Sequence, residues 1–364
     1  MNEDAKTATG LVVQEPVAVL GVGVEGKATI DYLLGQGVSD ISARDRQTVE
    51  GLPGGVQTVF GEGYDRGLDR FATVFRSPGI RPDHRSLVHA AAAGARITSA
   101  LSCFMERCPA RAVIGVTGTV GKGTTASLTA AALEAAGITA HLGGNIGLSP
   151  LEFLDRVQPD HVVVLEISSF QAMDISTPPD VGVILKTTSE HLDWHSDVGE
   201  YRRAKANLVA RQSADDVVVL NADSEGSVEI ASASEGRRLA YSLEDPVEQG
   251  LFLGEDGFVL RLDDRESRLP IDIRSVCLPG RFNLQNVAAA LLASMSVGAA
   301  IDPICAAAQS FTSLPHRLEL VANHGGVRYV DDSYATRPEA ALAALSAMDD
   351  APLALILGGS EKHA

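Results

Sequence analysis

The residues from 113 to 137, VIGVTGTVGKGTTASLTAAALEAAG, combine types and spacing that suit phosphate binding. An apolar run leads into a glycine-rich turn, a lysine and a helical pattern, and Gly115 to Lys122 has the G-x-x-x-x-G-K spacing. Backbone N–H groups at residues 117–124 could hold β- and γ-phosphates while the Lys122 ammonium neutralises their charge. Such loops next carry a serine or threonine that binds Mg²⁺, whereas this chain has Gly123. A purely structural glycine turn is the alternative.

A second glycine-rich turn, GVGVEG, follows the apolar run VAVLG and opens a helical pattern. Gly21, Gly23 and Gly26 would let the backbone approach a diphosphate at the start of the helix, and Asp45 ends the next apolar run. NAD(P), another nucleotide diphosphate and an ordinary tight turn all remain open at this point.

Glu166, in LEISSFQ, lies at the end of a buried strand, where open α/β sheets gather their ligands. A carboxylate there suits Mg²⁺, bound directly or through water, or else a structural ion pair. His191 and His195 are four residues apart, as in a zinc pair on a helix, but no cysteine cluster accompanies them and zinc is not expected.

Four further polar positions have a structural interpretation beside a functional one. Lys205, in YRRAKANL, is by default part of a solvated basic helix face. Asn283 and Asn286 begin a helix and by default cap it, although their amides could also bind the edge of a base. Arg317 and Asp332 could contact a phosphate and a ribose or metal, or form an ion pair.

Apolar runs alternate with amphipathic helical patterns along most of the chain, which indicates parallel sheets with crossover helices. Residues 237–275 have the pattern of a small antiparallel insertion, and a helix at 338–347 and a strand at 353–357 are expected near the end. We predict an α/β protein with a Rossmann-like domain at 1–108, a central P-loop ATPase-like domain at 109–313, and the start of a third Rossmann-like domain at 314–364. The third block is expected to be incomplete, since some fifty residues are few for such a domain.

The composition narrows the class of protein. The chain has 364 residues and a net charge of −17, which argues against nucleic acid or an anionic membrane as its main partner. The four cysteines lack metal-binding spacing, the N-terminus is unlike a signal peptide, and no apolar run is long enough to span a bilayer. We expect a soluble, cytoplasmic, monomeric protein that binds anions in local pockets.

Taken together and in this order, the motifs resemble those of the Mur ligases. The matching segments are TGTVGKGTT, GGNIG, EISSFQ, EHLDWH followed by YRRAK, NLQN, LPHRLE and VDDSYAT. The versions of GGNIG and EISSFQ, with LGVGVEGKA and ARDR before them, are most similar to the branch of the family that adds D-glutamate. The resemblance implies that UDP-N-acetylmuramoyl-L-alanine and D-glutamate are joined at the expense of ATP, with Mg²⁺, through an acyl phosphate.

The resemblance also assigns roles to individual residues. Four residues would be catalytic: Lys122, Glu166, His191 and Lys205. Metal would be held by Glu166, His191, Lys205 in a carbamylated form, and Thr124. The ATP site would comprise Gly118, Thr119, Val120, Gly121, Lys122, Gly123, Thr124, Asn283, Asn286, Arg317 and Asp332. The UDP-linked substrate would contact Gly21, Gly23, Asp45, Arg46, Asn145, Ser168 and Gln171.

The chain departs from the family pattern at several positions. Gly123 replaces the usual hydroxyl residue, Val120 an asparagine or lysine, Lys186 an asparagine, and Tyr334 the lysine of D-S-K-A-T. These departures leave room for two related alternatives, a nucleotide-binding Mur-ligase fragment with impaired catalysis and a ligase similar to folylpolyglutamate synthase. An NAD(P) oxidoreductase would leave the second loop and NLQN unexplained.

Overall fold

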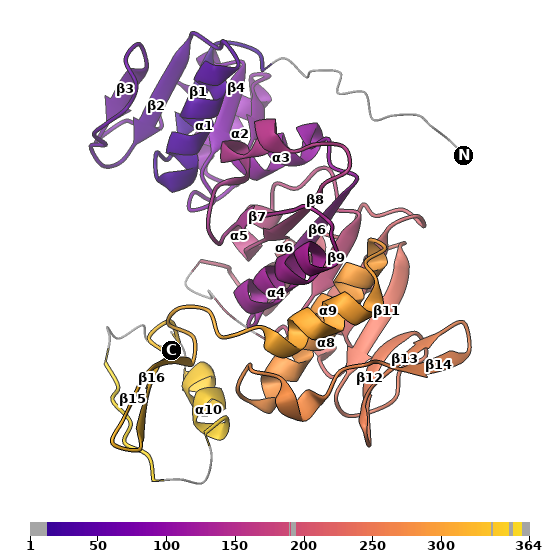
Figure 1. The fold of residues 1–364 in the computed structure, drawn as a ribbon. Coiled ribbons are helices and arrows are strands. Elements are labelled where there is room, and N and C mark those ends of the chain that lie inside the picture. The colour runs from indigo at the N-terminus through magenta and orange to yellow at the C-terminus, as the bar shows by residue number, and fades with distance from the viewer. Residues whose placement is uncertain (1–12, 189, 191–193, 336–337, 349–351, 359–364) are drawn as a thin grey trace.

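The computed structural model describes residues 13–188, 190, 194–335, 338–348 and 352–358. Three sheets follow one another along the chain. Figure 1 shows the first at the top, the second in the middle and the third at the lower left. In the described part of the chain, none of the helices is long and apolar enough to cross a membrane.

The first sheet has five parallel strands in the order β3-β2-β1-β4-β5. Its elements are β1 (Val17–Leu20), α1 (Val24–Gly35), β2 (Ile41–Asp45), β3 (Gln57–Phe60), β4 (Thr73–Arg76), α2 (Arg85–Ala92), β5 (Arg96–Thr98) and α3 (Ala100–Arg107). The chain moves outward from β1 to β3 and then returns to place β4 on the other side of β1. This reversal puts the first glycine turn at the point where doubly wound sheets open a crevice.

The second sheet has nine strands in the order β14-β13-β12-β11-β10-β9-β6-β8-β7. Its strands are β6 (Ala112–Thr117), β7 (Ala140–Gly144), β8 (Val162–Glu166), β9 (Val181–Ile184), β10 (Val217–Asn221), β11 (Arg237–Ser242), β12 (Gly250–Gly254), β13 (Gly257–Leu262) and β14 (Arg265–Arg268). After β6 the chain passes to β7 and β8 on one side and then to β9 on the other. The glycine-rich loop between β6 and α4, residues 118–121, therefore lies at the switch point of this sheet as well. We call it the phosphate-type loop.

Residues 237–275 extend this main sheet and do not form a separate one. β11 and β12 run parallel to β10, and only β13 and β14 are antiparallel. The antiparallel character predicted from sequence is confirmed for the outer pair, whereas the prediction was wrong for the inner pair. The sequence of a short polar strand does not reveal whether it pairs in a parallel or an antiparallel way, because this depends on the connection that leads to the neighbouring strand.

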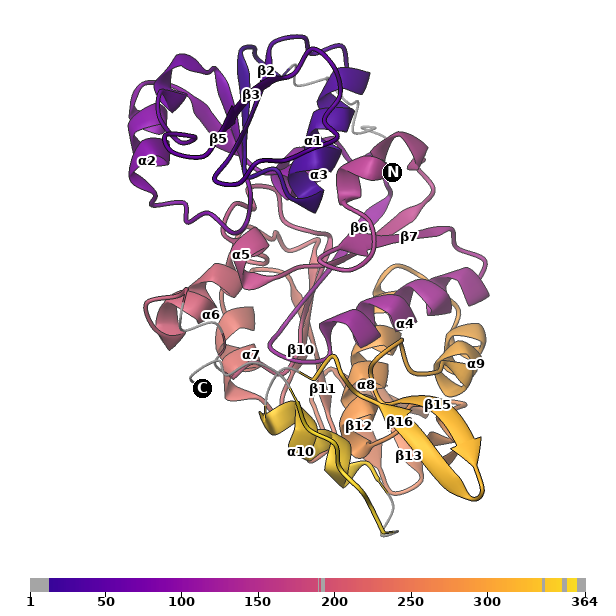
Figure 2. The same cartoon turned by 90° about the vertical axis from the view of Figure 1, so that its left-hand side faces the viewer.

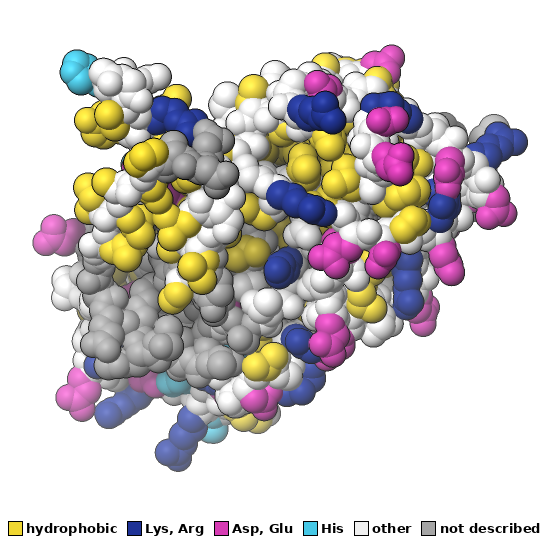
Figure 3. Space-filling model, turned by 90° about the horizontal axis from the view of Figure 1, so that it is seen from below, with side chains coloured by type: hydrophobic (Ala, Val, Ile, Leu, Met, Phe, Trp, Pro, Cys, Tyr) yellow, Lys and Arg dark blue, Asp and Glu magenta, His cyan; other side chains and the backbone are white. Residues whose placement is uncertain are grey.

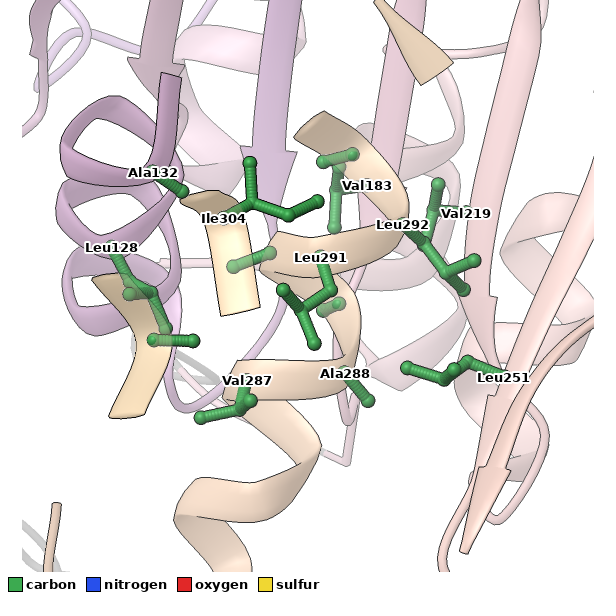
Figure 4. Packing of buried hydrophobic residues seen from close by; sticks show 14 of the residues in the cluster. Leu128, Ala132, Val183, Val219, Leu251, Val287, Ala288, Leu291, Leu292 and Ile304 are labelled. Carbon is green, nitrogen blue, oxygen red and sulfur yellow. The ribbon is translucent and has the colours of Figure 1, made fainter. Parts of the chain in front are cut away.

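Helices cover both faces of the second sheet, as Figure 2 shows. On one face lie α4 (Lys122–Ala135), α8 (Arg281–Ser296) and α9 (Ile301–Ser310), and on the other α5 (Ser169–Ala172), α6 (Val198–Ala206) and α7 (Glu225–Ala231). Successive side chains of a strand point to opposite faces, and β8 follows this rule: Val162 and Val164 belong to one core, Val163 and Leu165 to the other. Figure 4 shows the first core, where Leu128, Leu291 and Ile304 of the three helices meet.

The second core continues into the first sheet's domain. Phe104 of α3 makes an edge-to-face contact with Phe153, with ring centroids 5.6 Å apart. Arg76 at the end of β4, fully buried, forms an ion pair with Asp174, and Arg81 pairs with Glu200 at 2.9 Å. These contacts fix the crevice of the first sheet relative to that of the second.

The third block contains the antiparallel pair β15 (Glu319–His324) and β16 (Val327–Asp331), followed by α10 (Pro338–Ser346). The helix predicted at 338–347 is confirmed, but the strand predicted at 353–357 is not formed, since residues 352–358 have no regular structure. A strand needs a neighbour for its N–H and C=O groups, and the described residues supply none to this run. Apolar side chains of the block are exposed, and Figure 3 shows hydrophobic side chains gathered on this end of the molecule.

Candidate active site

The phosphate-type loop connects β6 to α4 at residues 118–121. Gly118 and Gly121 have φ values of +155° and +87°. A Cβ atom on Gly121 would lie 2.2 Å from Asn286 Oδ1, and one on Gly118 would lie 2.7 Å from Leu185 Cβ. Both positions therefore require glycine. No side chain caps the start of α4, so its first N–H groups remain available to an anion.

Lys122 is the first residue of α4 and folds back over the loop. Its Nζ donates to the carbonyl oxygens of Gly118 at 3.2 Å and Thr119 at 3.0 Å. Burial lowers the pKa of Lys122, while the carboxylates of Glu166 and Glu190 act in the opposite direction. An anion in the loop would offset that desolvation and give the ammonium group a charged partner.

Glu166 ends β8 opposite the first turn of α4, with only 5% of its surface exposed. Its Oε1 accepts a hydrogen bond from Asn145 Nδ2 at 2.9 Å. A Cβ atom on Gly123 would lie 3.1 Å from Glu166 Oε2. A side chain at position 123 would thus point directly at the carboxylate of Glu166.

The GGNIG segment brings Asn145 to this carboxylate. Gly144 has a φ of +99°, and a Cβ atom there would lie 2.2 Å from the Glu166 carbonyl oxygen. The Asn145 N–H donates to the same carbonyl at 2.8 Å. Only glycine allows the two backbones to approach so closely, which explains the residue type before Asn145.

Lys205 of α6 is buried, with 1% of its surface exposed, so the sequence-based interpretation of a solvated face was wrong. Its Nζ donates to Thr117 Oγ1 at 3.2 Å and to the Gly118 carbonyl at 2.9 Å. Desolvation, reinforced by the charge of Lys122, holds the pKa of Lys205 well below its ordinary value. The structure places this amine directly under the phosphate-type loop.

Two residues near the loop were not identified as candidate site residues from the sequence. Tyr201 is fully buried, and its hydroxyl lies 3.0 Å from Thr119 Oγ1. Its ring lies 4.7 Å from Lys205 Nζ, and the i, i+4 spacing of these two residues on one helix face was a usable signal. Glu190 is the second: its carboxylate raises the pKa of both Lys122 and Lys205 against the effect of burial.

His191 lies outside the described residues. His195, its partner in the zinc pattern, is buried beside α5, with Nε2 3.0 Å from Ser169 Oγ. Its ring stacks on Phe170 and meets Trp194 edge-on, with centroids 5.6 and 4.7 Å apart. His195 therefore packs among aromatic side chains on the face of the second sheet that α5 covers.

Asn283 and Asn286 are both buried near the start of α8, and their side chains form a chain of amides. Asn283 Nδ2 donates to the Pro279 carbonyl at 2.6 Å, and Asn286 Nδ2 donates to Asn283 Oδ1 at 2.8 Å. Asn286 Oδ1 in turn lies against Gly121 and accepts from Thr125 Oγ1 at 3.3 Å. The amides therefore brace the phosphate-type loop instead of capping α8, which was the default expectation.

Arg317 reaches the same loop from the third block. Its Nη2 would lie 3.8 Å from a Cβ atom on Gly123. The positive charge of Arg317 contributes to the lowered pKa of Lys122, as expected for two cationic side chains that lie close to each other. Asp332 accepts a hydrogen bond from the Leu318 N–H at 3.0 Å and so supports the segment that carries Arg317.

In the first domain, Gly21, Gly23 and Asp45 lie at the switch point, and Arg46 directly follows β2. A Cβ atom on Gly21 would lie 2.5 Å from Ser77 Cβ, whereas Gly23, at the start of α1, has open space around it. Asp45 Oδ2 accepts the Val22 N–H at 2.7 Å and shapes the turn. Arg46 lines a cavity of about 940 Å³ together with the loop at 61–69.

Ser168 and Gln171 connect this turn to the central domain. They cap α5 reciprocally, with Gln171 Oε1 accepting from the Ser168 N–H at 3.0 Å. Gln171 Nε2 donates to Glu25 Oε1 on α1. Burial raises the pKa of Glu25, and the amide hydrogen bond partly opposes this. Gln171 thus links the helix that begins at the first glycine turn to the segment that follows Glu166.

Two doubly wound sheets, each with a glycine turn at its switch point, define an α/β protein, and the comparisons identify its class. The model of the Mur ligase middle domain matches residues 116–294, and that of the Mur ligase MurD-like N-terminal domain matches residues 15–99. The chain belongs to the Mur ligase family.

Among curated relatives, the chain is similar to two UDP-N-acetylmuramoylalanine–D-glutamate ligases. It is 33% identical to that of Clostridium tetani, with 100% of this chain and 79% of the relative covered. It is 37% identical to that of Symbiobacterium thermophilum, with 97% and 79% covered. Among solved structures, UDP-N-acetylmuramate–alanine ligase from Thermotoga maritima shares the fold, at a TM-score of 0.56 and 18% identity over 91% of this chain and 76% of that one.

Proposed function

We propose that the chain is an ATP-dependent ligase that joins D-glutamate to UDP-N-acetylmuramoyl-L-alanine in peptidoglycan synthesis. The observation that carries the proposal is the meeting of Glu166, Lys205 and the start of α4 around one glycine loop. The names of the two curated relatives supply the substrates.

The reaction needs two displacements. An oxygen of the substrate carboxylate attacks the γ-phosphorus of ATP, the bond to ADP breaks, and an acyl phosphate forms. The amine of D-glutamate then attacks the acyl carbon, phosphate leaves, and the nitrogen loses a proton. The N–H groups of residues 118–124 and the Lys122 ammonium would hold the transferring phosphoryl group and offset its charge. Lys122 now contacts two loop carbonyls and would turn from them to phosphate oxygens.

The donor set fits a magnesium ion. Glu166 offers a buried carboxylate, and hard oxygen donors are what Mg²⁺ prefers. When bound, the ion would neutralise part of the phosphate charge. We propose Glu166, His191 and the carbamate of Lys205 as its protein ligands, with the Thr124 hydroxyl as a further candidate.

Carbamylation of Lys205 is supported by its surroundings. An amine attacks carbon dioxide only when it is unprotonated, and burial favours that form of Lys205. The addition forms an N–C bond and releases a proton, which leaves an oxygen anion in place of a neutral amine. Such an anion under the loop would attract the Lys122 ammonium group.

For the nucleotide, we propose that residues 118–124 hold the phosphates and that Asn283, Asn286, Arg317 and Asp332 complete the site. For the UDP-linked substrate, the free start of α1 at Gly23 would bind the diphosphate, with Asp45 and Arg46 near the uracil and Asn145, Ser168 and Gln171 toward the peptide. These roles divide the chain at 1–108, 109–313 and 314–364.

The test combines binding and turnover. Calorimetric titrations of the chain with UDP-N-acetylmuramoyl-L-alanine, a folate and NADH should detect only the first ligand. Phosphate release from ATP should then require both the UDP substrate and D-glutamate. A Lys122→Ala variant should lose phosphate release, whereas Lys27→Ala, an exposed lysine of α1, should retain it. Binding of NADH or folate without the UDP substrate would contradict the proposal.

A further inference from the structure

The segment that carries Arg317 has an unusual backbone. His316 and Leu318, on either side of the arginine, have φ values of +62° and +47°. Residues other than glycine rarely adopt this left-handed conformation, and it persists only where the surroundings hold it in place. We call residues 316–319 and 331–334, which hold one another, the arginine clasp.

Three hydrogen bonds join the two halves of the arginine clasp. His316 Nδ1 lies 2.7 Å from Asp331 Oδ2. The Leu318 N–H donates to Asp332 Oδ1 at 3.0 Å, and the Tyr334 N–H donates to the His316 carbonyl at 3.1 Å. Asp331 raises the pKa of His316, and His316 lowers that of Asp331 to about 2, so the charged pair is favoured around neutral pH. The left-handed residues are therefore fixed from the opposite segment.

The guanidinium of Arg317 contacts the Tyr334 ring and lies near the start of α4. Its central carbon is 4.5 Å from the centroid of that ring, which is the geometry of a cation–π contact. Arg317 Nη2 would lie 3.8 Å from a Cβ atom on Gly123. The ring thus backs a cation that faces the start of α4.

We propose that Tyr334 is a positioning residue, which holds the Arg317 guanidinium ready for the terminal phosphates of the nucleotide. The inference rests on the proposed ATP site and adds to it a residue that acts through Arg317 alone. A flexible arginine loses side-chain entropy when it binds a phosphate, and a ring that already fixes its plane reduces that loss. The hydrogen-bonded backbone of the arginine clasp also helps to position the guanidinium, because it fixes the Cα atom from which the Arg317 side chain extends.

The experiment measures ATP and AMP affinities of the full chain by calorimetry. Tyr334→Leu removes the π face and should weaken ATP binding about two- to fivefold, the strength of an exposed cation–π contact. Tyr334→Phe keeps the ring and should bind ATP within about twofold of the unaltered chain. AMP, which lacks the terminal phosphates, should bind all of these proteins equally. Tyr329→Leu, an exposed tyrosine of β16, is the matched control and should change neither affinity.

A second arm separates positioning from a general structural role. In an Arg317→Ala background, Tyr334→Leu should cause no further loss of ATP affinity, because nothing remains for the ring to position. An equal loss in both backgrounds, or ATP binding by Tyr334→Leu as tight as that of the unaltered chain, would overturn the inference. Failure of the unaltered chain to bind ATP would instead refute the proposed function and this inference with it.

Discussion

Gly123→Ser is the substitution whose effect the structure predicts most sharply. The side chain at this position would point at Glu166, with its Cβ atom 3.1 Å from Oε2 and 3.2 Å from Ile146 Cδ1. Both contacts are tight by a few tenths of an ångström, but each involves the end of a side chain that can shift. A serine hydroxyl would then lie beside the carboxylate that we propose as a metal ligand.

The expected gain in binding free energy comes from one protein oxygen that replaces a water on the metal. A net hydrogen bond or its equivalent contributes about 1 kcal/mol, which corresponds to roughly fivefold tighter binding of Mg·ATP. The affinity for ATP without metal should hardly change, because the backbone N–H of residue 123 is kept. Without the serine, a water molecule can occupy the same position, since Mg²⁺ normally retains several waters.

Gly123→Ala is the matched control, because it introduces the same Cβ crowding without the hydroxyl. Calorimetric titration of both variants with ATP, in Mg²⁺ and in EDTA, should show tightening only for serine and only with Mg²⁺. Equal affinities for the serine and alanine variants would refute the predicted role of the hydroxyl. Weaker Mg·ATP binding by serine than by alanine would show that Thr124 already holds the metal and that residue 123 faces an occupied position.

Three other predictions follow from buried or paired groups. Lys205→Ala should abolish ligase activity, and short carboxylic acids should partly restore it by replacing the carbamate oxygens. Arg76→Ala should lower the free energy of unfolding by about 3–5 kcal/mol in urea, because it strands Asp174 in the domain interface. His141→Phe should flatten the loss of stability below pH 6.5. Burial and the charge of His161 lower the pKa of His141 in the folded protein. The unfolded chain therefore binds this proton at a higher pH than the folded protein does, and the free energy of unfolding falls as the pH drops.

Each of these has a control on an exposed basic residue. Arg203→Ala changes a cation of α6 that faces solvent, and its activity should not respond to carboxylic acids. Arg237→Ala should stay within about 0.5 kcal/mol of the unaltered chain. His89→Phe should leave the pH profile of stability unchanged. A Lys205→Ala enzyme with full activity, a stable Arg76→Ala protein, or an unaltered pH profile in His141→Phe would contradict the corresponding prediction.

Local patterns predicted the strand–loop–helix units well. Residues 113–137 form β6, the loop and α4 as expected, because an apolar run, glycines and a helical pattern are all properties of adjacent residues. Glu166 and Asp45 end strands for the same reason. The strand expected at 353–357 failed because pairing depends on a neighbour, which no local pattern contains.

Long-range contacts could not be predicted in this way. Lys205 is 88 residues from Thr117, whose hydroxyl accepts its hydrogen bond. Within YRRAK, only the i, i+4 spacing from Tyr201 separates the buried lysine from the exposed Arg203, and that spacing does not say which distant residues the lysine contacts. Asn286 accepts a hydrogen bond from Thr125, 161 residues earlier in the chain, so a capping role was the natural expectation from local sequence. In both cases only the family resemblance indicated that the residue belongs to the site.

The charges around the loop suit the polyanion that we propose to bind there, although the chain as a whole is strongly acidic. The chain carries a net charge of −17, yet Lys122, Lys205 and Arg317 converge on one loop with Glu166 and Glu190 as the opposing carboxylates. Desolvation lowers the pKa of both lysines. In the proposed site, a triphosphate would supply negative charge that offsets the desolvation of Lys122, and Arg317 would face the same phosphates. Lys205 has the different role of a neutral amine that takes up carbon dioxide, and its carbamate would then hold the metal.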